Sequence, residues 1–233
     1  MTRRSRPTTG IASARRSPFG ALLVVAGAFG ANGTAHAAKT LPGVDFTPPP
    51  ERMLRSRLLD ETCTSDEQGI ADAAIANARD ALQVAVDDLA NAPRELMDEL
   101  DIDATRYGYW LGEYDETRYE GVLAGYRATL DVIDGGTVAV NCTCDEEGVF
   151  AYVYRDEPTV YLCPVFWVVP ALGVDSQMGT IVHELTHLVD TFASEDYGYG
   201  TTNVRFLAQT DPDVAVKNAD SLERFVENTP ELP

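Results

Sequence analysis

The segment HELTH, residues 183–187, has the residue types and spacing of a metal-dependent hydrolytic site. Residues four apart on a helix lie on one face, so His183 and His187 can each offer a ring nitrogen to one ion. Glu184 lies beside them and can take a proton from a zinc-bound water, whose pKa the metal lowers to about 7. The third and last histidine, His36, lies in a predicted export signal. A chance match or a buried structural pair of histidines is the alternative, and the scarcity of histidine disfavours chance.

A catalytic zinc commonly takes three protein ligands and keeps a fourth position open. No histidine remains for the third position, and the cysteines are expected to be oxidised, so a carboxylate must supply it. The downstream candidates are Asp190, Glu195, Asp196, Asp211, Asp213, Asp220, Glu223 and Glu227. A ligand just after the helix, where the chain can turn back, is geometrically easier, which favours Glu195 or Asp196 without deciding between them. Asp190 is better suited to orienting a histidine.

The pattern around these residues predicts that a helix presents them. Asp175 or Ser176 is placed to cap this helix, which is expected to run to about Phe192. The side opposite the histidines is an apolar stripe that would anchor the helix in the core, made by Ile181, Leu185, Leu188 and Phe192. A polar segment rich in Gly and Tyr follows over 193–203.

The rest of the chain predicts a mostly helical α+β domain with a small antiparallel sheet. Helices are expected from a capping box at Thr64 to about Ala90, over 93–100, over about 117–133 and over about 213–228. Strands rich in Val, Tyr and Thr are expected over 137–142, 149–154 and 159–162. The length remaining after export is enough for one domain with a substantial core.

The beginning of the chain has the organisation of an export signal. Five arginines precede a short apolar stretch, Ala21–Phe29, and an A-x-A site places the expected cut after Ala37. A general secretory signal is favoured over twin-arginine export, for which Arg15-Arg16 is a weak hint. The apolar stretch is too short to span a membrane. We therefore predict a secreted, extracellular protein with a signal peptide over 1–37 and a linker or short pro-segment over 38–58.

The charge of the chain excludes some partners. The chain of 233 residues carries 18 basic and 37 acidic side chains, a net charge of −19, and without the signal 13 basic residues remain, for a charge near −24. Such a chain should repel nucleic acid and anionic membranes and could attract basic substrates. Plain solubility of a secreted protein explains the same charge, and net charge alone does not separate the two.

The cysteines are Cys63, Cys142, Cys144 and Cys163. An even number in an exported chain predicts two disulfides. A strand-like C-x-C points its two cysteines to opposite faces, so Cys142 and Cys144 are not expected to pair with each other, which leaves two pairings open. A cysteine-rich zinc site is the alternative, but the C-x-x-C spacing typical of such sites is missing.

The segment after the histidines resembles a family motif. Residues 194–200, SEDYGYG, are similar to the G-T-x-D-x-x-Y-G motif of the aspzincins, which include the deuterolysins and the fungal peptidyl-Lys metalloendopeptidases. The resemblance implies that Asp196, nine residues after the second histidine, is the third zinc ligand. It implies that Tyr199 hydrogen-bonds the transition-state oxyanion or packs beside the substrate. Ala193 and Ser194 replace the Gly and Thr of the motif, and neither position supplies the metal contact.

Two further stretches resemble the peptidyl-Lys branch of that family, residues 149–163 and 218–223. The branch implies the disulfides Cys63–Cys142 and Cys144–Cys163. It also implies that Asp220 and Glu223 bind the ammonium of a lysine just after the scissile bond. An i, i+3 pair on a helix can face one pocket, and a deep acidic pocket selects a basic side chain. A solvated helix face is the alternative, and Arg224, beside the pair, would weaken the field of the pocket if it points inward.

The resemblance covers most of residues 60–233 and implies a zincin-like metalloendopeptidase domain over 59–233. The function it implies is a secreted endopeptidase with one catalytic Zn²⁺ that cleaves on the amino side of lysine, with Glu184 activating water. Protein or peptide substrates containing lysine are the expected partners of a monomer, with no nucleic acid and no membrane. The alternatives are a deuterolysin-like protease of broader specificity and a non-catalytic secreted binding module with a relict metal site.

Overall fold

The structure is a computed structural model that describes residues 36–41, 43–44, 46–47, 63–97, 101–229 and 231–232. Residues 1–35 of the predicted export signal, and most of the predicted linker, lie outside this part of the chain. Within the described part, no helix is long and apolar enough to cross a membrane. The domain boundaries given above therefore stay predictions.

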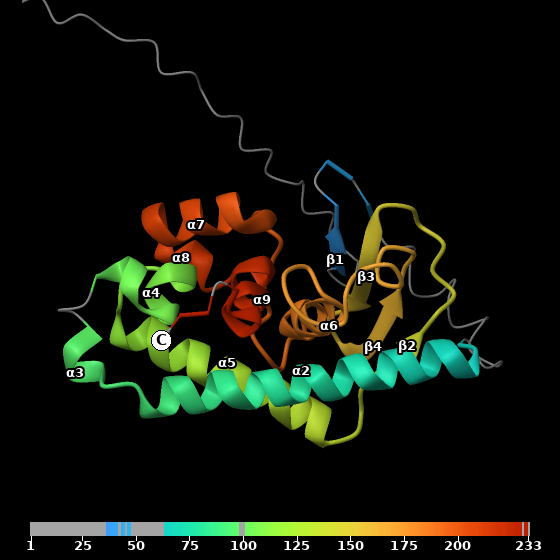
Figure 1. Cartoon of the computed structure of the whole chain (residues 1–233), viewed down its shortest axis with the longest axis horizontal. Helices are drawn as coiled ribbons and strands as arrows, with labels where there is room; N and C mark the ends of the chain where they lie inside the picture. The colour runs from blue at the N-terminus through green and yellow to red at the C-terminus, as the bar shows by residue number, and fades with distance from the viewer. Residues whose placement is uncertain are drawn as a thin grey trace, which may run out of the picture. The chain divides into compact units, whose positions relative to one another are not determined.

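Two long helices form the base of the domain (Figure 1), α2 (Ser65–Asn91) and α5 (Glu116–Asp134). Helix α2 begins with the expected capping box, in which the backbone N–H of Thr64 donates to the Glu67 carboxylate at 2.7 Å. Its buried face is mostly alanine, which lets α5 and the central helix approach closely: Ala71, Ala74, Ala78, Leu82, Ala85, Val86 and Leu89. Both helices match their predicted ranges to within a few residues.

The sheet is mixed rather than antiparallel. Its strands β1 (His36–Thr40), β2 (Ala139–Asn141), β3 (Val149–Tyr154) and β4 (Glu157–Leu162) lie in the order β1-β3-β4-β2. Strand β3 runs antiparallel to β1 and β4, but β2 pairs in parallel with β4. The predicted α+β class is confirmed, and the prediction of a wholly antiparallel sheet is wrong for β2.

Disulfides explain the parallel pairing of β2. Cys142–Cys63 ties the end of β2 to the start of α2, and Cys144–Cys163 ties the chain just after β2 to the end of β4. The ends of β2 and β4 are thus held together, with 4.7 Å between the Cα atoms of the second bridge, which favours a parallel pair over a hairpin with β3. The pairing that the family resemblance implies is the one in the structure.

Strand β1 has no counterpart in the predictions. It pairs with β3 over its five residues, from His36 opposite Tyr154 to Thr40 opposite Val149, with a register shift at the end. The sequence gives no strand signal here, because Pro42-Gly43 and the prolines of 48–50 dominate the region. Residues 38–40 of the predicted linker or short pro-segment thus belong to an edge strand.

The central helix α6 (Gln177–Thr186) lies between the sheet and α9 (Ala219–Glu227), as Figure 1 shows. Ser176 caps it, its hydroxyl accepting from the N–H of Gly179 at 2.9 Å. The helix ends at Thr186, short of the predicted Phe192. Beyond it the chain folds back across its end, so that the N–H of Ser194 donates to the Thr186 carbonyl at 3.1 Å.

Shorter helices complete the domain: α3 (Arg94–Met97), η1 (Ile102–Ala104), α4 (Arg106–Leu111), α7 (Gly200–Thr210) and α8 (Pro212–Ala215). The sequence predicts neither α4 nor α7. The helix predicted over 213–228 is two helices, because the chain turns at 216–218 between α8 and α9.

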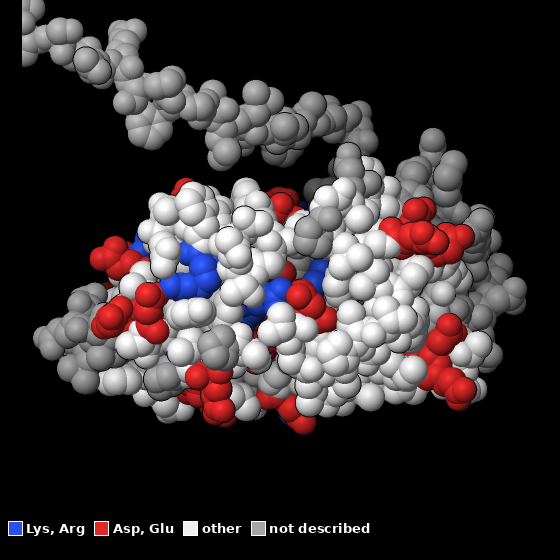
Figure 2. All heavy atoms as spheres, turned by 45° about the horizontal axis from the view of Figure 1, so that its top comes forward, with Lys and Arg blue, Asp and Glu red and all other residues white. Residues whose placement is uncertain are grey.

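Charge is spread unevenly over the face drawn in Figure 2. Acidic side chains lie around it, and basic side chains gather near its middle, next to acidic ones. Among the described residues of that face, no continuous basic band of the kind that binds nucleic acid is visible.

Candidate active site

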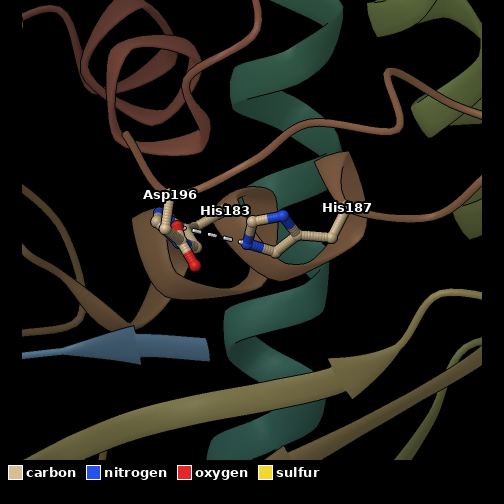
Figure 3. Close-up of side chains that lie close together, drawn as sticks. All are labelled: His183, His187 and Asp196. Carbon is tan, nitrogen blue, oxygen red and sulfur yellow. Dashed lines mark hydrogen bonds and ion pairs between the residues drawn. The ribbon is translucent and has the colours of Figure 1, made fainter. Parts of the chain in front are cut away.

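Three side chains converge at the end of α6 (Figure 3). His183 and His187 lie one turn apart and are buried, and the returning loop places Asp196 against both. The Oδ1 atom of Asp196 lies 3.0 Å from Nε2 of His183 and 3.5 Å from Nε2 of His187. One ligand atom from each residue lies within 4.8 Å of the others. Helical spacing explains the two histidines, and the early end of α6 explains the aspartate.

The other nitrogen of each ring has its own acceptor. Nδ1 of His183 lies 3.1 Å from the Glu223 carboxylate, and Nδ1 of His187 lies 3.0 Å from the carbonyl of Ser194. When Nδ1 carries the proton, the Nε2 lone pair faces Asp196, which is the usual arrangement of metal-binding histidines. Nε2 of His187 is buried without a hydrogen-bond partner among the described residues. With Nε2 of each ring deprotonated, two imidazoles and a carboxylate, one of the imidazole nitrogens lacking a hydrogen bond, fit a zinc ion.

The histidines and the neighbouring carboxylates shift one another's pKa values. Burial would raise the pKa of Asp196, but the positive charge of His187 and a hydrogen bond from His183 hold it well below its usual range. Burial would lower the pKa of His183, but hydrogen bonds to Asp196 and Glu223 raise it to about 10. A site with this much negative charge around two histidines attracts a cation.

Glu184 is buried beside the histidines, and one of its two carboxylate oxygens accepts a hydrogen bond from the described residues while the other does not. Its Oε1 accepts from the backbone N–H of Lys39 at 3.0 Å, and its Oε2 has no hydrogen-bond partner among the described residues. Burial raises the pKa of Glu184 to about 7, against the lowering effect of the two histidines. A carboxylate with such a pKa can both accept and release a proton near neutral pH.

Tyr199 packs against His183 and contacts strand β1. Its hydroxyl donates to the carbonyl of Ala38 at 2.7 Å, and its ring stacks on that of His183 with 6.1 Å between the centroids. Burial raises the pKa of the Tyr199 phenol, and the charge of Asp196 raises it further. The phenol therefore stays protonated and remains a hydrogen-bond donor.

Asn218 holds the loop that carries Asp196. Its side-chain oxygen accepts from the N–H groups of Tyr197 at 2.9 Å and Gly198 at 3.0 Å, and its amide donates back to the Gly198 carbonyl at 3.0 Å. Ser194, which replaces the Thr of the family motif, keeps a hydroxyl, and this lies 2.8 Å from that of Thr186. This role of Asn218 cannot be recognised in the sequence, because side-chain hydrogen bonds to a loop leave no periodic signal.

The other carboxylates proposed as third ligands lie elsewhere. Glu195 pairs with Arg155 at 2.6 Å, and Asp190 is exposed. Asp213 pairs with Arg118 at 3.0 Å, and Asp211 caps α8. The three remaining candidates, Asp220, Glu223 and Glu227, lie on α9 and form a second acidic cluster.

This second cluster, which we call the acidic pocket, surrounds the ammonium of a lysine of the chain itself. The ammonium of Lys39 is paired with Glu223 and lies 3.4 Å from the carboxylate of Asp175. Burial would lower the pKa of Lys39, but Glu223, Asp220, Glu227 and Asp175 together raise it. Asp220 anchors the start of α7 through the N–H of Gly200 at 2.8 Å.

Arg224 points into the cluster rather than away from it. Its guanidinium lies 2.7 Å from Asp175, 3.0 Å from Glu227 and 3.6 Å from Asp220. This contact partly offsets the negative charge of the pocket. Four carboxylates still face one arginine, so the pocket retains negative charge for a second cation.

Burial and mutual repulsion act differently on the three acids of α9. Burial would raise the pKa of Glu223, but Lys39 and His183 lower it well below its usual range. Burial and the charge of Glu223 raise the pKa of Asp220, and they raise that of Glu227 to about 8. Of the three acids of α9, Glu223 is therefore the one whose pKa is lowered, and it stays negatively charged near neutral pH.

Gly179 forms one wall of the pocket. A Cβ added there would lie 2.1 Å from an oxygen of Glu227 and 2.6 Å from one of Glu223. Glu227 uses the same space to accept from the N–H and the hydroxyl of Ser176, each at 3.1 Å, at the start of α6. The sequence does not indicate that Gly179, Asp175 and Glu227 lie together, since they come from the start of α6 and the end of α9.

An HExxH helix against a small sheet, with an aspartate returned to both histidines, defines a zincin-like metallopeptidase. Residues 98–227, more than half of the chain, match the model of the aspzincin family, which is described as lysine-specific metallo-endopeptidase. The chain belongs to this family, which confirms the resemblance drawn from its motifs.

Similar proteins point the same way. An extracellular protease of Aeromonas hydrophila is 47% identical over 126 residues, and a peptidyl-Lys metalloendopeptidase of Grifola frondosa is 44% identical over 126 residues. Each match covers 54% of this chain and only 36% of the relative. The solved structure of a zinc peptidase from Grifola frondosa aligns with a TM-score of 0.66 at 36% identity, covering 73% of this chain and all of that one.

Proposed function

We propose that this protein is a secreted zinc-dependent endopeptidase that hydrolyses peptide bonds on the amino side of lysine. His183, His187 and Asp196 would bind one zinc ion. Family membership supports the peptidase activity, and the relative from Aeromonas hydrophila is named an extracellular protease. The observation that carries the lysine preference is the buried ammonium of Lys39 among four carboxylates, with the backbone of the same residue against Glu184.

The roles of the residues follow from their positions. His183, His187 and Asp196 would hold the zinc ion, and its chemistry when bound would be to polarise the scissile carbonyl and lower the pKa of a bound water. Glu184 takes the proton of the attacking water and passes it to the leaving nitrogen, a position marked by the N–H of Lys39 at 3.0 Å. Tyr199 donates to the carbonyl oxygen and stabilises the charge that develops there.

The acidic pocket explains why lysine would follow the cleaved bond. A buried cation is stable only when it is paired, and Glu223 and Asp175 supply that pairing. A neutral side chain would leave these carboxylates unpaired, which is a large penalty against the wrong substrate. Arg224 already occupies part of the space, so the remaining room fits a slender ammonium better than a second guanidinium.

The test is digestion of a protein of known sequence, with the cleavage sites mapped by mass spectrometry. Cuts before lysine by the wild type, lost in Glu184→Ala, are the expected result. Cuts scattered without regard to lysine would instead support the broader, deuterolysin-like specificity. Absence of zinc-dependent cleavage would support a binding module with a relict site.

A further inference from the structure

Strand β1 lies against the proposed catalytic residues of its own chain. It is an edge strand, extended and antiparallel to β3, which is how peptides add to a sheet. Figure 3 shows β1 beside the three convergent side chains, and the backbone contacts agree with the view. The hydrogen bonds of β1 identify the peptide bond that lies next to Glu184 and Tyr199.

Both ends of the peptide bond between Ala38 and Lys39 contact proposed catalytic residues. Its carbonyl oxygen accepts from Tyr199 at 2.7 Å. Its nitrogen donates to Glu184 at 3.0 Å, the group that would protonate the leaving amine. The preceding N–H, of Ala38, donates to Asp196 at 3.3 Å, which keeps the residue against the proposed ligands.

The side chain after this bond occupies the specificity pocket. Lys39 is 1% exposed, its ammonium is paired with Glu223, and it lies 4.8 Å from the centre of the Phe150 ring. A lysine buried to this degree is rare unless it is fully paired. The segment thus places a lysine directly after the bond that lies against Glu184 and Tyr199.

The use of lysine along the chain points to the same residue. Only two of the 18 basic residues are lysines, Lys39 and Lys217, and the other 16 are arginines. Lys217 lies in the turn before α9, where its carbonyl accepts from the N–H of Glu195 at 2.8 Å. This composition leaves a protease that cleaves before lysine only two such bonds in its own sequence, and of the two lysines Lys39 is the one whose N–H contacts Glu184.

We propose that Ala38–Lys39 is a self-cleavage site and that β1 keeps the cleft closed until this bond is hydrolysed. The inference rests on the proposed function. Water adds to the carbonyl carbon of Ala38, the C–N bond breaks, and Ala38 keeps the new carboxylate. The proton passes through Glu184 to the nitrogen of Lys39, which becomes a new amino terminus.

Cleavage also weakens the hold of the cleft on the strand. The pairing of β1 with β3 is divided between Ala38 and Lys39, and the new ammonium lies beside Glu184, where the proposed zinc ion would repel it. Before cleavage, β1 belongs to the same chain and competes with substrate peptides at a high effective concentration. This advantage lasts only while the contacts of β1 with the proposed catalytic residues persist. Removal of the predicted signal after Ala37 would leave the Ala38–Lys39 bond intact, so self-cleavage can follow it.

The experiment uses the full chain, purified with a chelator and then supplied with zinc. The amino terminus is followed by intact mass and by sequencing, while hydrolysis of an added lysyl peptide is recorded in parallel. We expect Lys39 to become the amino terminus with a rate constant that does not change on tenfold dilution. Peptide hydrolysis should begin with a lag of the same time constant.

Matched variants separate the causes. Glu184→Ala should keep the bond intact, and Lys217→Arg should be processed like the wild type. Lys39→Ala should not be cut at this bond, and because it loses the buried ammonium that anchors β1, it should cleave the added peptide without a lag. Lys39→Arg keeps the charge, and its self-cleavage should slow by the same factor as an arginyl peptide compared with a lysyl one.

Two outcomes overturn the proposal while leaving the proposed function standing. One is full lysyl-peptide hydrolysis by wild type in which the Ala38–Lys39 bond is still intact. The other is removal of residues up to Ala38 from Glu184→Ala, which would show that another protease makes the cut. Absence of lysyl-peptide hydrolysis in wild type, Lys39→Ala and Lys217→Arg alike would instead refute the proposed function, and this inference with it.

Discussion

Two acidic clusters lie next to each other in the structure, and the groups around them favour different cations. In one, Asp196 faces the ring nitrogens of His183 and His187. In the other, the carboxylates of α9 and Asp175 surround the ammonium of Lys39 and the guanidinium of Arg224. In the first, which we call the metal cluster, both histidines direct Nε2 at the carboxylate, whereas the second, which we call the ammonium cluster, is reached by one imidazole, through Nδ1 of His183. The neighbours of a carboxylate, rather than the carboxylate itself, decide which cation it takes.

The largest expected effect comes from Asp196→Ala, which removes one of three proposed ligands from the metal cluster. Zinc affinity should fall about 10³-fold or more, since three ligands share a binding free energy of about 10–16 kcal/mol. Competition with a chromophoric chelator measures it. Glu195→Ala is the matched control, because Glu195 pairs with Arg155 and should leave zinc affinity unaltered. Equal affinities in the two variants would remove Asp196 from the metal cluster.

Tyr199→Phe tests the chemistry next to the metal cluster without touching a ligand. Loss of the phenol should lower kcat about 10²-fold, the usual cost of one oxyanion donor, with KM and zinc affinity nearly unchanged. Steady-state kinetics on a lysyl peptide measure it. Tyr197→Phe, at a half-exposed position in the same loop, should retain wild-type kcat. A rise in KM alone would show that Tyr199 only packs beside the substrate.

Glu223→Gln should disturb both clusters at once, because Glu223 touches His183 and Lys39. Loss of the charge behind a histidine ligand commonly costs about 10- to 100-fold in metal affinity, and lysine preference should fall too. Asp220→Asn should weaken the lysine preference and leave zinc affinity within a few-fold of wild type. Identical zinc affinities in the two variants would mean that the clusters are independent.

Gly179→Ala should affect the ammonium cluster more than the metal cluster. The added methyl would press against Glu227 and Glu223, so kcat/KM for lysyl peptides should fall about tenfold, in line with the usual 1–3 kcal/mol of overpacking. Zinc binding should persist. Gly121→Ala, in α5 with open space around it, is the control and should be neutral or slightly stabilising. Wild-type kinetics in Gly179→Ala would show that this wall of the pocket can yield.

The sequence predicts the metal cluster much better than the ammonium cluster. His183, Glu184 and His187 follow from helical spacing, and Asp196 follows from a short motif within a few residues of them. The pocket joins Asp175, Gly179 and Glu227, which become neighbours only after α9 packs against the start of α6. Such non-local contacts leave no local pattern in the sequence.

The fold shows the same division. Helices α2 and α5 are predicted to within a few residues because their apolar period is long and their ends carry caps. The early end of α6 is missed because its apolar period continues to Phe192 while the Asp196 loop folds back. Strand β1 is missed because its five residues have no strand signal of their own and are held by β3.

Glu223 has a thermodynamic consequence beyond its position. One oxygen lies 3.1 Å from a histidine of the metal cluster, and the other is paired with the ammonium. The two binding equilibria are therefore linked, and the coupling free energy is the same in both directions. Whatever factor a bound lysine side chain applies to the affinity for zinc, zinc must apply to the affinity for lysine.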